Sequence, residues 1–445
     1  MDIFCIFKTI GQNEHMKKRL LTIIGILGYL LILGQSPEIE SWLLNANGDM
    51  AYYDFYPGPP PTTTSVQMTD SSDVKTVCYD ASDVYVRANG LPSYSMGPWL
   101  QNPNVPASQE WVFKFPRNPI EELGTKTGTP FGGALGVAIN GVVLYGYGDG
   151  KSYSSVQDAN VGNGDGNWDA DAWVSEGPTM DASGGGHATM TGVYHYHATP
   201  FALYTDPSTG HSVIIGYAFD GFPIYGPFGY ANATDSNSGI TRMVSSYQLR
   251  SITDRTILPD GSNSAPPGPA VSASFPLGTY IQDYEYVAGL GTLDEYNGRY
   301  CYTPEYPNGT YAYFLSTDNN GDPIFPYVLA DSYYGEVLQS DIQNAGNSIA
   351  PGGLTCYTGS PSFIDANNLE VVSLYPNPAS ASVVIETEYL AKEIQVISME
   401  GKVIERITPV KYREELNLEN IPNGVYLVRI LNNSSVSSQR LVITK

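Results

Sequence analysis

The chain has 445 residues, of which 45 are Asp or Glu and 22 are Lys or Arg, so its formal net charge is −23 at pH 7. A surface this acidic repels phosphate backbones, and we therefore expect no nucleic-acid partner. The hydrophobic content of 42% permits packed cores, while 34 Tyr, 46 Gly and 32 Pro indicate many short strands and turns with little helix. We therefore predict a mainly β protein.

Residues 1–34 have the layout of a secretory signal peptide. The basic cluster Met16–Arg19 precedes the apolar run 20–33, and small residues follow it. This apolar run is too short to span a bilayer comfortably, so we expect cleavage near Gly34, a start at Met16 and no permanent transmembrane anchor. An uncleaved amphipathic or membrane anchor is the alternative.

Residues 35–72 are predicted to form an extended linker. The segment contains Pro57, Pro59, Pro60 and Pro61, and proline cannot donate a ladder hydrogen bond. Runs of strand-like composition begin after this segment. They cover Val74–Tyr79, Asp83–Arg87, Trp111–Phe115 and Gly136–Tyr145. The Asn-Gly pair inside the last run predicts a β-hairpin.

A polar, glycine-rich segment runs from Asp149 to Asp171. Its Asp and Asn side chains supply spaced oxygens of the kind that ligate calcium. No twelve-residue loop with a closing Glu fits the register, so we prefer a long surface loop and treat calcium as the weaker interpretation.

Four of the five histidines lie close together, at positions 187, 195, 197 and 211. Successive side chains of a strand point to opposite faces, so His195 and His197 share one face of a predicted strand and its tyrosines share the other. A His-x-His pair joined by a third histidine from a neighbouring loop is a recurring way to bind zinc or copper. The predicted metal ligands are His187, His195 and His197. The residues expected to supply a fourth ligand or to orient an imidazole ring are Asp181, Asp220 and His211.

This histidine cluster leaves several functions open. Zinc with an open fourth position would lower the pKa of a bound water, which could then attack an ester, amide or phosphoester outside the cell. Copper beside the tyrosines would suit redox chemistry or copper storage. The same Tyr and His side chains can instead pack in a half-buried strand without a metal. The protein would then be a surface adhesion, glycan-binding or structural protein, and we assign neither a catalytic residue nor an extracellular ligand.

The histidine strand has a counterpart later in the chain. Residues 192–197 read GVYHYH and residues 309–314 read GTYAYF, with Ala312 and Phe314 at the positions of the two histidines. A true internal repeat would mean that the alternating tyrosines are architectural and that the histidines are an addition.

Three cysteines, Cys78, Cys301 and Cys356, follow the predicted leader. In an oxidising compartment three thiols allow at most one internal disulfide, and the pairing cannot be deduced from the sequence alone. We favour a bridge between Cys301 and Cys356.

Residues 358–369 form a mostly polar linker, after which six short strand-like runs in residues 370–445 predict a small β-sandwich. This segment resembles the C-terminal sorting domain of the type IX secretion system. The matching landmarks are Tyr375–Pro378, Met399–Lys402, Ile421–Tyr426 and the basic-ended strand that finishes at Lys445. The resemblance implies an immunoglobulin-like sandwich, contact with the type IX secretion machinery, and export across both membranes, secreted or held at the cell surface. An unrelated sandwich module is the alternative.

The middle of the chain resembles the YHYH-domain family over about residues 89–335. The motifs that carry this resemblance are Asn89–Pro92, Gly97–Trp99, Gly136–Val142, Asp181 with Gly185–His187, the Tyr194–His197 string, Gly216–Pro227 and Leu293–Arg299. We expect a β-rich domain over residues 73–357. The resemblance implies no established activity.

The chain departs from the family pattern at three places. Family members often carry histidines in the stretch matching Thr310–Phe314, can carry His at the position of Tyr94, and can carry Cys near Ser183. This chain has none of these residues. A second histidine cluster is therefore not expected, which leaves the four histidines named above as the imidazole site.

Overall fold

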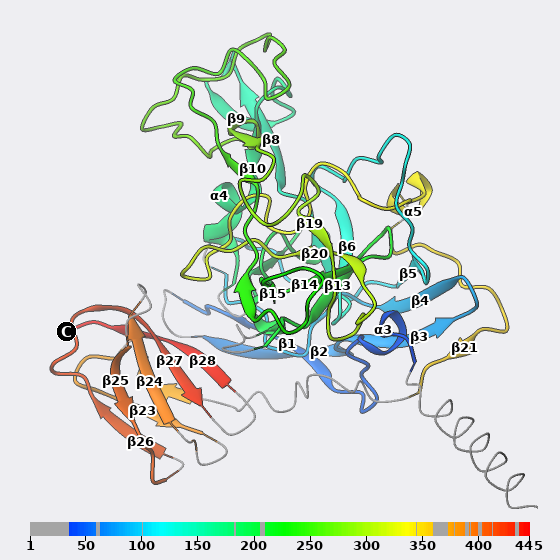
Figure 1. Cartoon of the computed structure of the whole chain (residues 1–445). Helices are drawn as coiled ribbons and strands as arrows, with labels where there is room; N and C mark the ends of the chain where they lie inside the picture. The colour runs from blue at the N-terminus through cyan, green and yellow to red at the C-terminus, as the bar shows by residue number, and fades with distance from the viewer. Residues whose placement is uncertain are drawn as a thin grey trace, which may run out of the picture.

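The computed structural model describes residues 35–445 apart from several short stretches. Those left out are 59–62, 100, 182–183, 205–209, 344, 359–372, 378, 388–390, 392, 399–402, 412 and 432–435. The predicted signal peptide lies outside the described residues, as does the predicted linker from residue 359 onward. None of the helices in the described part of the chain has the length and apolar character of a membrane span. Strands dominate and the helices are short, which confirms the expected mainly β fold (Figure 1).

An eight-stranded mixed sheet forms the centre of the molecule. Its strands are β6 (Ala134–Ala138), β7 (Val143–Tyr145), β11 (Gly186–Ala188), β12 (Tyr194–Tyr196), β13 (Ile214–Ala218), β14 (Pro223–Tyr225), β19 (Gly298–Cys301) and β20 (Thr310–Phe314). They are ordered β11-β12-β7-β6-β13-β14-β20-β19. Almost every residue of these strands is buried, because the sheet is covered on both faces. The strands therefore carry mostly apolar side chains on both faces and do not alternate between polar and apolar residues.

The two halves of this sheet have the same strand arrangement. The hairpin β6–β7 and the hairpin β13–β14 lie side by side at the centre. Outside the hairpins, β12 runs parallel to β7 on one side and β20 runs parallel to β14 on the other. The edge strands β11 and β19 then pair antiparallel with β12 and β20. The two segments that resemble each other in sequence, 192–197 and 309–314, therefore fall on corresponding strands, so the alternating tyrosines are part of the repeated scaffold.

Glycines allow the two central hairpins to pair closely. A Cβ atom on Gly136 would lie 2.5 Å from the Tyr217 carbonyl oxygen, and one on Gly216 would lie 2.6 Å from the Val137 carbonyl oxygen. The predicted Asn-Gly hairpin is confirmed in β6–β7, where Gly141 has a φ of +81°, a conformation that favours glycine.

A second sheet of four strands holds the disulfide bond. It contains β3 (Val74–Tyr79), β4 (Asp83–Ala88), β5 (Trp111–Pro116) and β21 (Thr355–Cys356), in the order β21-β3-β4-β5. β21 pairs with β3 so that Cys356 lies opposite Cys78, and these two form the disulfide. The predicted Cys301–Cys356 bridge is therefore wrong, since Cys301 is free and buried at the end of β19 in the other sheet.

The prediction of an extended linker over residues 35–72 is also wrong. This segment contains α3 (Pro37–Glu40) and the antiparallel pair β1 (Met50–Phe55) and β2 (Thr64–Ser71). Ile39 and Trp42 are buried in the main core. In the sequence the prolines fall between Phe55, where β1 ends, and Thr64, where β2 begins, so the ladder needs no hydrogen bond from a proline N–H.

The polar segment after β7 folds into an arm, defined here as residues 148–171. It consists of β8 (Gly148–Ser154), β9 (Ala159–Gly162) and β10 (Asp169–Asp171), ordered β10-β8-β9, and it projects from the body at the top of Figure 1. The preferred interpretation as a surface loop is thus wrong. A small core of Tyr153, Trp168 and Tyr280 supports the arm, beside the fully buried ion pair of Arg255 and Asp283.

The remaining elements of the large domain are short. They are α4 (Ala172–Glu176), η1 (Gly177–Thr179), η2 (Phe201–Leu203), β15 (Phe228–Tyr230), β16 (Ile240–Arg242), β17 (Tyr247–Leu249), η3 (Ile281–Asp283), β18 (Tyr284–Tyr286) and α5 (Gln339–Gln343). β15 pairs with β16 and β17 pairs with β18. Of these elements, α4 and η1 matter most for the site, since they connect the arm to β11.

The C-terminal segment forms two antiparallel sheets with their own core. One sheet contains β22 (Ser373–Tyr375), β23 (Ser382–Glu386) and β26 (Arg413–Asn417). The other contains β24 (Glu393–Ser398), β25 (Val403–Ile407), β27 (Gly424–Leu431) and β28 (Val436–Ile443), in the order β25-β24-β27-β28. Alternate residues such as Val383, Ile385, Val428 and Ile430 point into this core. The arrangement agrees with the predicted small β-sandwich.

Candidate metal centre

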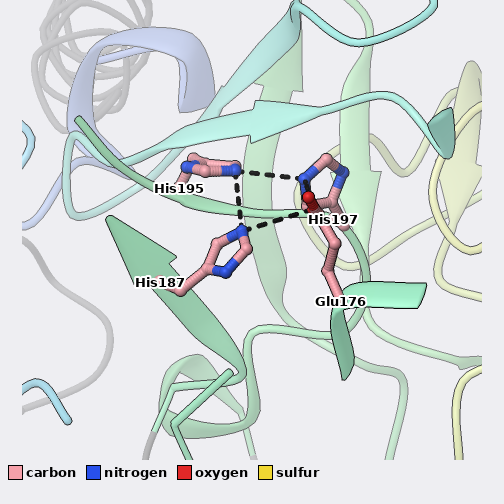
Figure 2. Close-up of side chains that lie close together, drawn as sticks. All are labelled: Glu176, His187, His195 and His197. Carbon is pink, nitrogen blue, oxygen red and sulfur yellow. Dashed lines mark hydrogen bonds and ion pairs between the residues drawn. The ribbon is translucent and has the colours of Figure 1, made fainter. Parts of the chain in front are cut away.

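Two neighbouring strands place the three predicted histidine ligands together (Figure 2). β11 and β12 pair antiparallel with His187 directly opposite His195, and His197 follows β12 on the same face as His195. The Nε2 atoms of His187 and His195 are 3.2 Å apart, and those of His195 and His197 are 3.0 Å apart. All three rings are buried. The alternation of strand side chains thus brings three imidazoles to one point.

A carboxylate outside the predicted set joins the three imidazoles. Glu176 is the last residue of α4, and its Oε2 atom lies 3.2 Å from Nε2 of His197 and 3.5 Å from Nε2 of His187. Asp171 caps the start of α4 by accepting a hydrogen bond from the backbone N–H of Val174, which fixes the direction of this short helix. The four ligand atoms all lie within 4.8 Å of one another. No sequence motif links Glu176 to the histidines, so only the path of α4 reveals it.

Hydrogen bonds at the far side of each ring fix which nitrogen faces the centre. Nδ1 of His195 lies 3.1 Å from the Val193 carbonyl oxygen, and Nδ1 of His197 lies 2.7 Å from the Gly146 carbonyl oxygen. A carbonyl oxygen only accepts, so in the neutral ring Nδ1 carries the proton and Nε2 presents its lone pair.

The third ring is fixed by a hydroxyl group. Thr179 donates its hydroxyl hydrogen to the Glu176 carbonyl oxygen at 2.7 Å, so its oxygen accepts from Nδ1 of His187 at 2.8 Å. Neutral His187 therefore also directs an unprotonated Nε2 at the centre. Three lone pairs and one carboxylate thus converge.

Burial and neighbouring charges favour the protonation states that bind a metal. Burial lowers the pKa of His195 well below its usual value, and the neighbouring His197 and His187 lower it further. Burial raises the pKa of Glu176, but contacts with His187 and His197 outweigh this effect and hold the pKa well below its usual range. Neutral His195 beside an ionised Glu176 is the ligand state that a cation requires.

Tyrosine side chains lie on both faces of the histidine strand, and one of them contacts the cluster. The Tyr145 ring on β7 lies with its centroid 4.2 Å from that of His195 and 5.8 Å from that of His197. The tyrosines of β12 point to the opposite face, where the hydroxyls of Tyr194 and Tyr196 lie 2.9 and 2.7 Å from the Tyr94 hydroxyl. The strand therefore separates an imidazole face from a phenol face.

The other predicted site residues, Asp181, Asp220 and His211, lie outside the histidine cluster. The carboxylate of Asp181 accepts from the Tyr194 hydroxyl at 2.7 Å, and that of Asp220 accepts from the Tyr313 hydroxyl at 2.6 Å. Both carboxylates thus hold phenols on the far face of the sheet.

The expectation that four imidazoles meet is wrong, because His211 is not part of the cluster. Its Nδ1 lies 2.7 Å from the Ser212 carbonyl oxygen, and its ring packs against Tyr225, Tyr230 and Phe314. His211 precedes β13, and β7 and β6 separate β13 from β12 in the sheet. Closeness in the sequence therefore does not bring it to the other three rings.

Family models match two parts of the chain. Residues 112–324 match the model described as YHYH protein, and residues 373–444 match the model described as secretion system C-terminal sorting domain. The chain carries a YHYH domain and a C-terminal sorting domain. Both resemblances found in the sequence are thus confirmed, and the sorting domain indicates contact with the type IX secretion machinery and export to the cell surface or beyond.

A solved structure gives a weak match. It is described as PorZ, an essential bacterial surface component of the type-IX secretion system of Porphyromonas gingivalis, with 11% sequence identity and a TM-score of 0.17. The match covers 86% of this chain and 62% of PorZ, so the chain spans less than two thirds of that protein. These values are too low to indicate a common fold. A comparison with curated proteins finds no match.

The imidazole cluster occupies one half of the YHYH domain's central sheet. In the other half, β20 carries Ala312 and Phe314 at the positions of the β12 histidines, and Arg299 lies opposite Ala312 where the first half has His187. Both halves of the sheet thus have the same strand arrangement, but the histidines of the first half have no counterparts at the matching positions of β19 and β20.

The donor set of the YHYH domain fits a four-coordinate metal ion. Bonds of about 2.0–2.1 Å in a tetrahedron place neighbouring donor atoms about 3.3–3.4 Å apart. Four of the six separations in the cluster, 3.0, 3.2, 3.2 and 3.5 Å, lie around this value, and all six are within 4.8 Å. Zinc and copper both accept imidazole nitrogen and carboxylate oxygen. The cluster can therefore hold a metal ion.

Proposed function

We propose that this exported YHYH protein binds a transition metal ion, zinc or copper, through Glu176, His187, His195 and His197. One observation carries the proposal: three Nε2 lone pairs and a carboxylate converge with neighbouring donor atoms 3.0–3.5 Å apart, and the Nδ1 hydrogen bonds leave no proton between them in the neutral rings. Acceptors in this arrangement repel each other, most strongly in a buried site. A cation at their centre converts this repulsion into coordination.

The position of Glu176 bears on the chemistry of the bound ion. Catalytic zinc sites hold the metal with three protein ligands and keep the fourth position for water. Here Glu176 takes the fourth position, so we infer a closed site in which the ion is held as a structural or stored metal. Extracellular hydrolysis or redox chemistry at this site would first require Glu176 to leave the ion.

Elemental analysis of the protein tests this proposal directly. The mature protein is purified without a His tag and its metal content is compared with that of the double variant His195→Ala, His197→Ala. We expect about one ion per wild-type chain and none in the double variant, because two of the four ligands are gone. His211→Ala is the matched control, since it removes an imidazole outside the cluster and is expected to retain the ion. Equal metal content in the wild type and the double variant would end the proposal.

A cleft in another part of the YHYH domain supports a second candidate function, glycan binding. The cleft has a volume of about 420 Å³ and lies at the end of the β13–β14 hairpin. Its walls include the rings of Tyr300, Tyr306 and Tyr334, and the polar side chains of Asn118 and Glu121. Tyrosine rings stack on sugar faces, while amide and carboxylate groups bind hydroxyls.

The two candidates make different predictions for the same variants. Tyr300 is 55% exposed at the cleft, so Tyr300→Ala removes a stacking surface without disturbing the core. If the protein binds glycans, signals on a glycan array disappear in Tyr300→Ala and persist in the double histidine variant. An array without any Tyr300-dependent signal rejects this second candidate.

A further inference from the structure

We propose that the bound metal ion acts as a latch that joins α4 to the edge of the central sheet, so that loading of the ion controls the opening of residues 173–180. This inference rests on the proposed metal site and assigns it a conformational role. His187 lies on β11, the edge strand of the sheet, and His195 lies on the neighbouring β12, with His197 directly after it, whereas Glu176 ends the helix that leaves the arm. Figure 2 shows Glu176 facing the three histidines from a different element, so an ion bound by all four side chains would join two separate parts of the fold.

Both ends of this segment are anchored by contacts that do not involve the cluster. At the start, the carboxylate of Asp171 accepts from the Tyr327 hydroxyl at 2.7 and 2.8 Å. At the end, the backbone N–H of Asp181 donates to the Gly186 carbonyl oxygen at 2.9 Å. Residues 173–180 therefore form a closed flap whose two ends stay attached to the body of the domain.

The flap itself has little that holds it shut. α4 is five residues long, and a helix of this length is unstable without outside contacts. At the start of the flap, Trp173 packs against the main core, with its ring centroid 6.4 Å from that of Phe201. Beyond Trp173, the side chains of Glu176 and Thr179 end at the histidine cluster. The order of the flap thus depends on the groups that surround the ion.

The ion determines whether the Glu176 carboxylate is attracted to the histidine cluster or repelled by it. When the rings are neutral and no cation is present, the carboxylate oxygen faces two imidazole lone pairs at 3.2 and 3.5 Å, and like partial charges push the end of α4 away from β12. With a cation at the centre, the same carboxylate is attracted. Loading the ion therefore closes the flap and removing it favours the open form.

The exposure of the ligands indicates how the ion enters. The side chain of Glu176 is 21% exposed, against 8% for His187 and 3% for His197. Glu176 is thus the outermost ligand, and moving it uncovers the buried imidazoles. The flap is therefore the route by which the ion reaches the site and leaves it.

Hydrogen exchange measured by mass spectrometry tests the latch on the full exported chain. The protein is stripped with a chelator and then reloaded with zinc chloride, and the metal content of each sample is measured. We expect the backbone amides of residues 173–180, among them those of Gly177 and Met180 that close the turns, to exchange at least about tenfold more slowly in the loaded protein. Exchange in β5, which lies in the other sheet, is expected to stay the same.

Glu176→Ala separates the latch from metal binding. Three imidazoles remain, so this variant is expected to take up zinc, while its flap exchanges rapidly with or without the ion. Glu110→Ala is the control, since Glu110 is exposed and pairs with Arg87 at the surface. Loaded wild-type protein whose flap exchanges as fast as in the stripped protein, or a Glu176→Ala flap that zinc still protects, overturns the latch alone. A wild type that takes up no zinc overturns the metal site itself.

Discussion

Tyr196 and Tyr313 occupy corresponding positions in the two halves of the central sheet, but their hydroxyls have different partners. The side-chain amide of Asn140 donates to the Tyr196 hydroxyl at 2.9 Å, whereas the Tyr313 hydroxyl donates to the carboxylate of Asp220 at 2.6 Å. Asn140 and Asp220 are the turn residues of the two central hairpins. One half of the repeated scaffold thus contains a neutral amide where the other contains a titratable group.

This difference predicts that Asp220 makes stability depend on pH. Burial raises the pKa of Asp220 from 3.8 to about 6, although hydrogen bonds from Tyr313 and Gly335 oppose the shift. Because the folded pKa lies above the unfolded value, the stability that this group contributes is fully present below about pH 4 and is lost as the pH rises through 6. We expect the free energy of unfolding in urea to fall over this range, and to fall less in Asp220→Asn.

The reciprocal variant Asn140→Asp provides the control. It places a carboxyl group in the equivalent buried turn and is expected to steepen the fall in stability between pH 4 and 6. Asp220→Asn keeps a single acceptor oxygen, so one of the two backbone N–H groups that donate to this carboxylate, those of Phe222 and Gly335, loses its acceptor, which costs about 1–3 kcal/mol at any pH. If the free energy of unfolding changed with pH in the same way in the wild type and both variants, Asp220 would not be the cause of the pH dependence.

Thr179 is predicted to tune the affinity of the metal site without touching the ion. Its hydroxyl accepts from Nδ1 of His187 and donates to the Glu176 backbone, so it fixes the tautomer of the ring. Loss of such a partner typically lowers metal affinity about 10–100-fold. We therefore expect weaker zinc binding in Thr179→Val, measured by competition with a chelating dye, and near-normal binding in Thr179→Ser. Equal affinity in the valine variant would show that the hydroxyl has no role.

Gly136 is predicted to be essential for pairing the two central hairpins. A Cβ atom there would lie 2.5 Å from the Tyr217 carbonyl oxygen, and a backbone atom in the middle of a sheet cannot move aside. We expect Gly136→Ala to lower the free energy of unfolding by about 1–3 kcal/mol or more, as overpacking does. Gly162→Ala on β9 meets no atom within 4 Å and is expected to change it little. Chemical denaturation of both variants measures the two free energies of unfolding. Equal values would contradict the prediction for Gly136.

Local patterns in the sequence predicted much of this molecule. The Asn-Gly pair predicted the β6–β7 hairpin, and the His-x-His spacing predicted that His195 and His197 share a face. The landmarks of the sorting domain predicted its sandwich. Each of these inferences depends on neighbours in the sequence, for which the period of a strand or the geometry of a turn is sufficient.

The features that were missed depend on contacts between distant parts of the chain. Glu176 reaches the histidines only because α4 turns back from the arm, and His211 is excluded by two intervening strands. The prolines near residue 60 led to the prediction of a linker. No feature of the neighbouring sequence shows that the strands on either side of these prolines pair with each other. Sheet order and the pairing of remote strands carry no local signal, so composition and spacing could not supply them.

The disulfide between Cys78 and Cys356 provides a test of such remote pairing. It links residues 278 positions apart, and removing a bridge of this kind costs about 2–5 kcal/mol. We expect the double variant Cys78→Ser, Cys356→Ser to unfold at correspondingly lower urea concentration, while a Cys301→Ser variant retains the bridge.

Thiol labelling of the protein without residues 1–34, which contain Cys5, checks the same assignment without mutating a cysteine. Burial raises the pKa of Cys301 to about 11, and the thiolate is the reactive form, so the native protein is expected to show almost no reactive thiol at pH 8. Denaturation without a reductant should expose one thiol, and peptide mapping should place the label on Cys301. A label on Cys78 would instead indicate the Cys301–Cys356 pairing and would contradict the adjacency of β21 and β3.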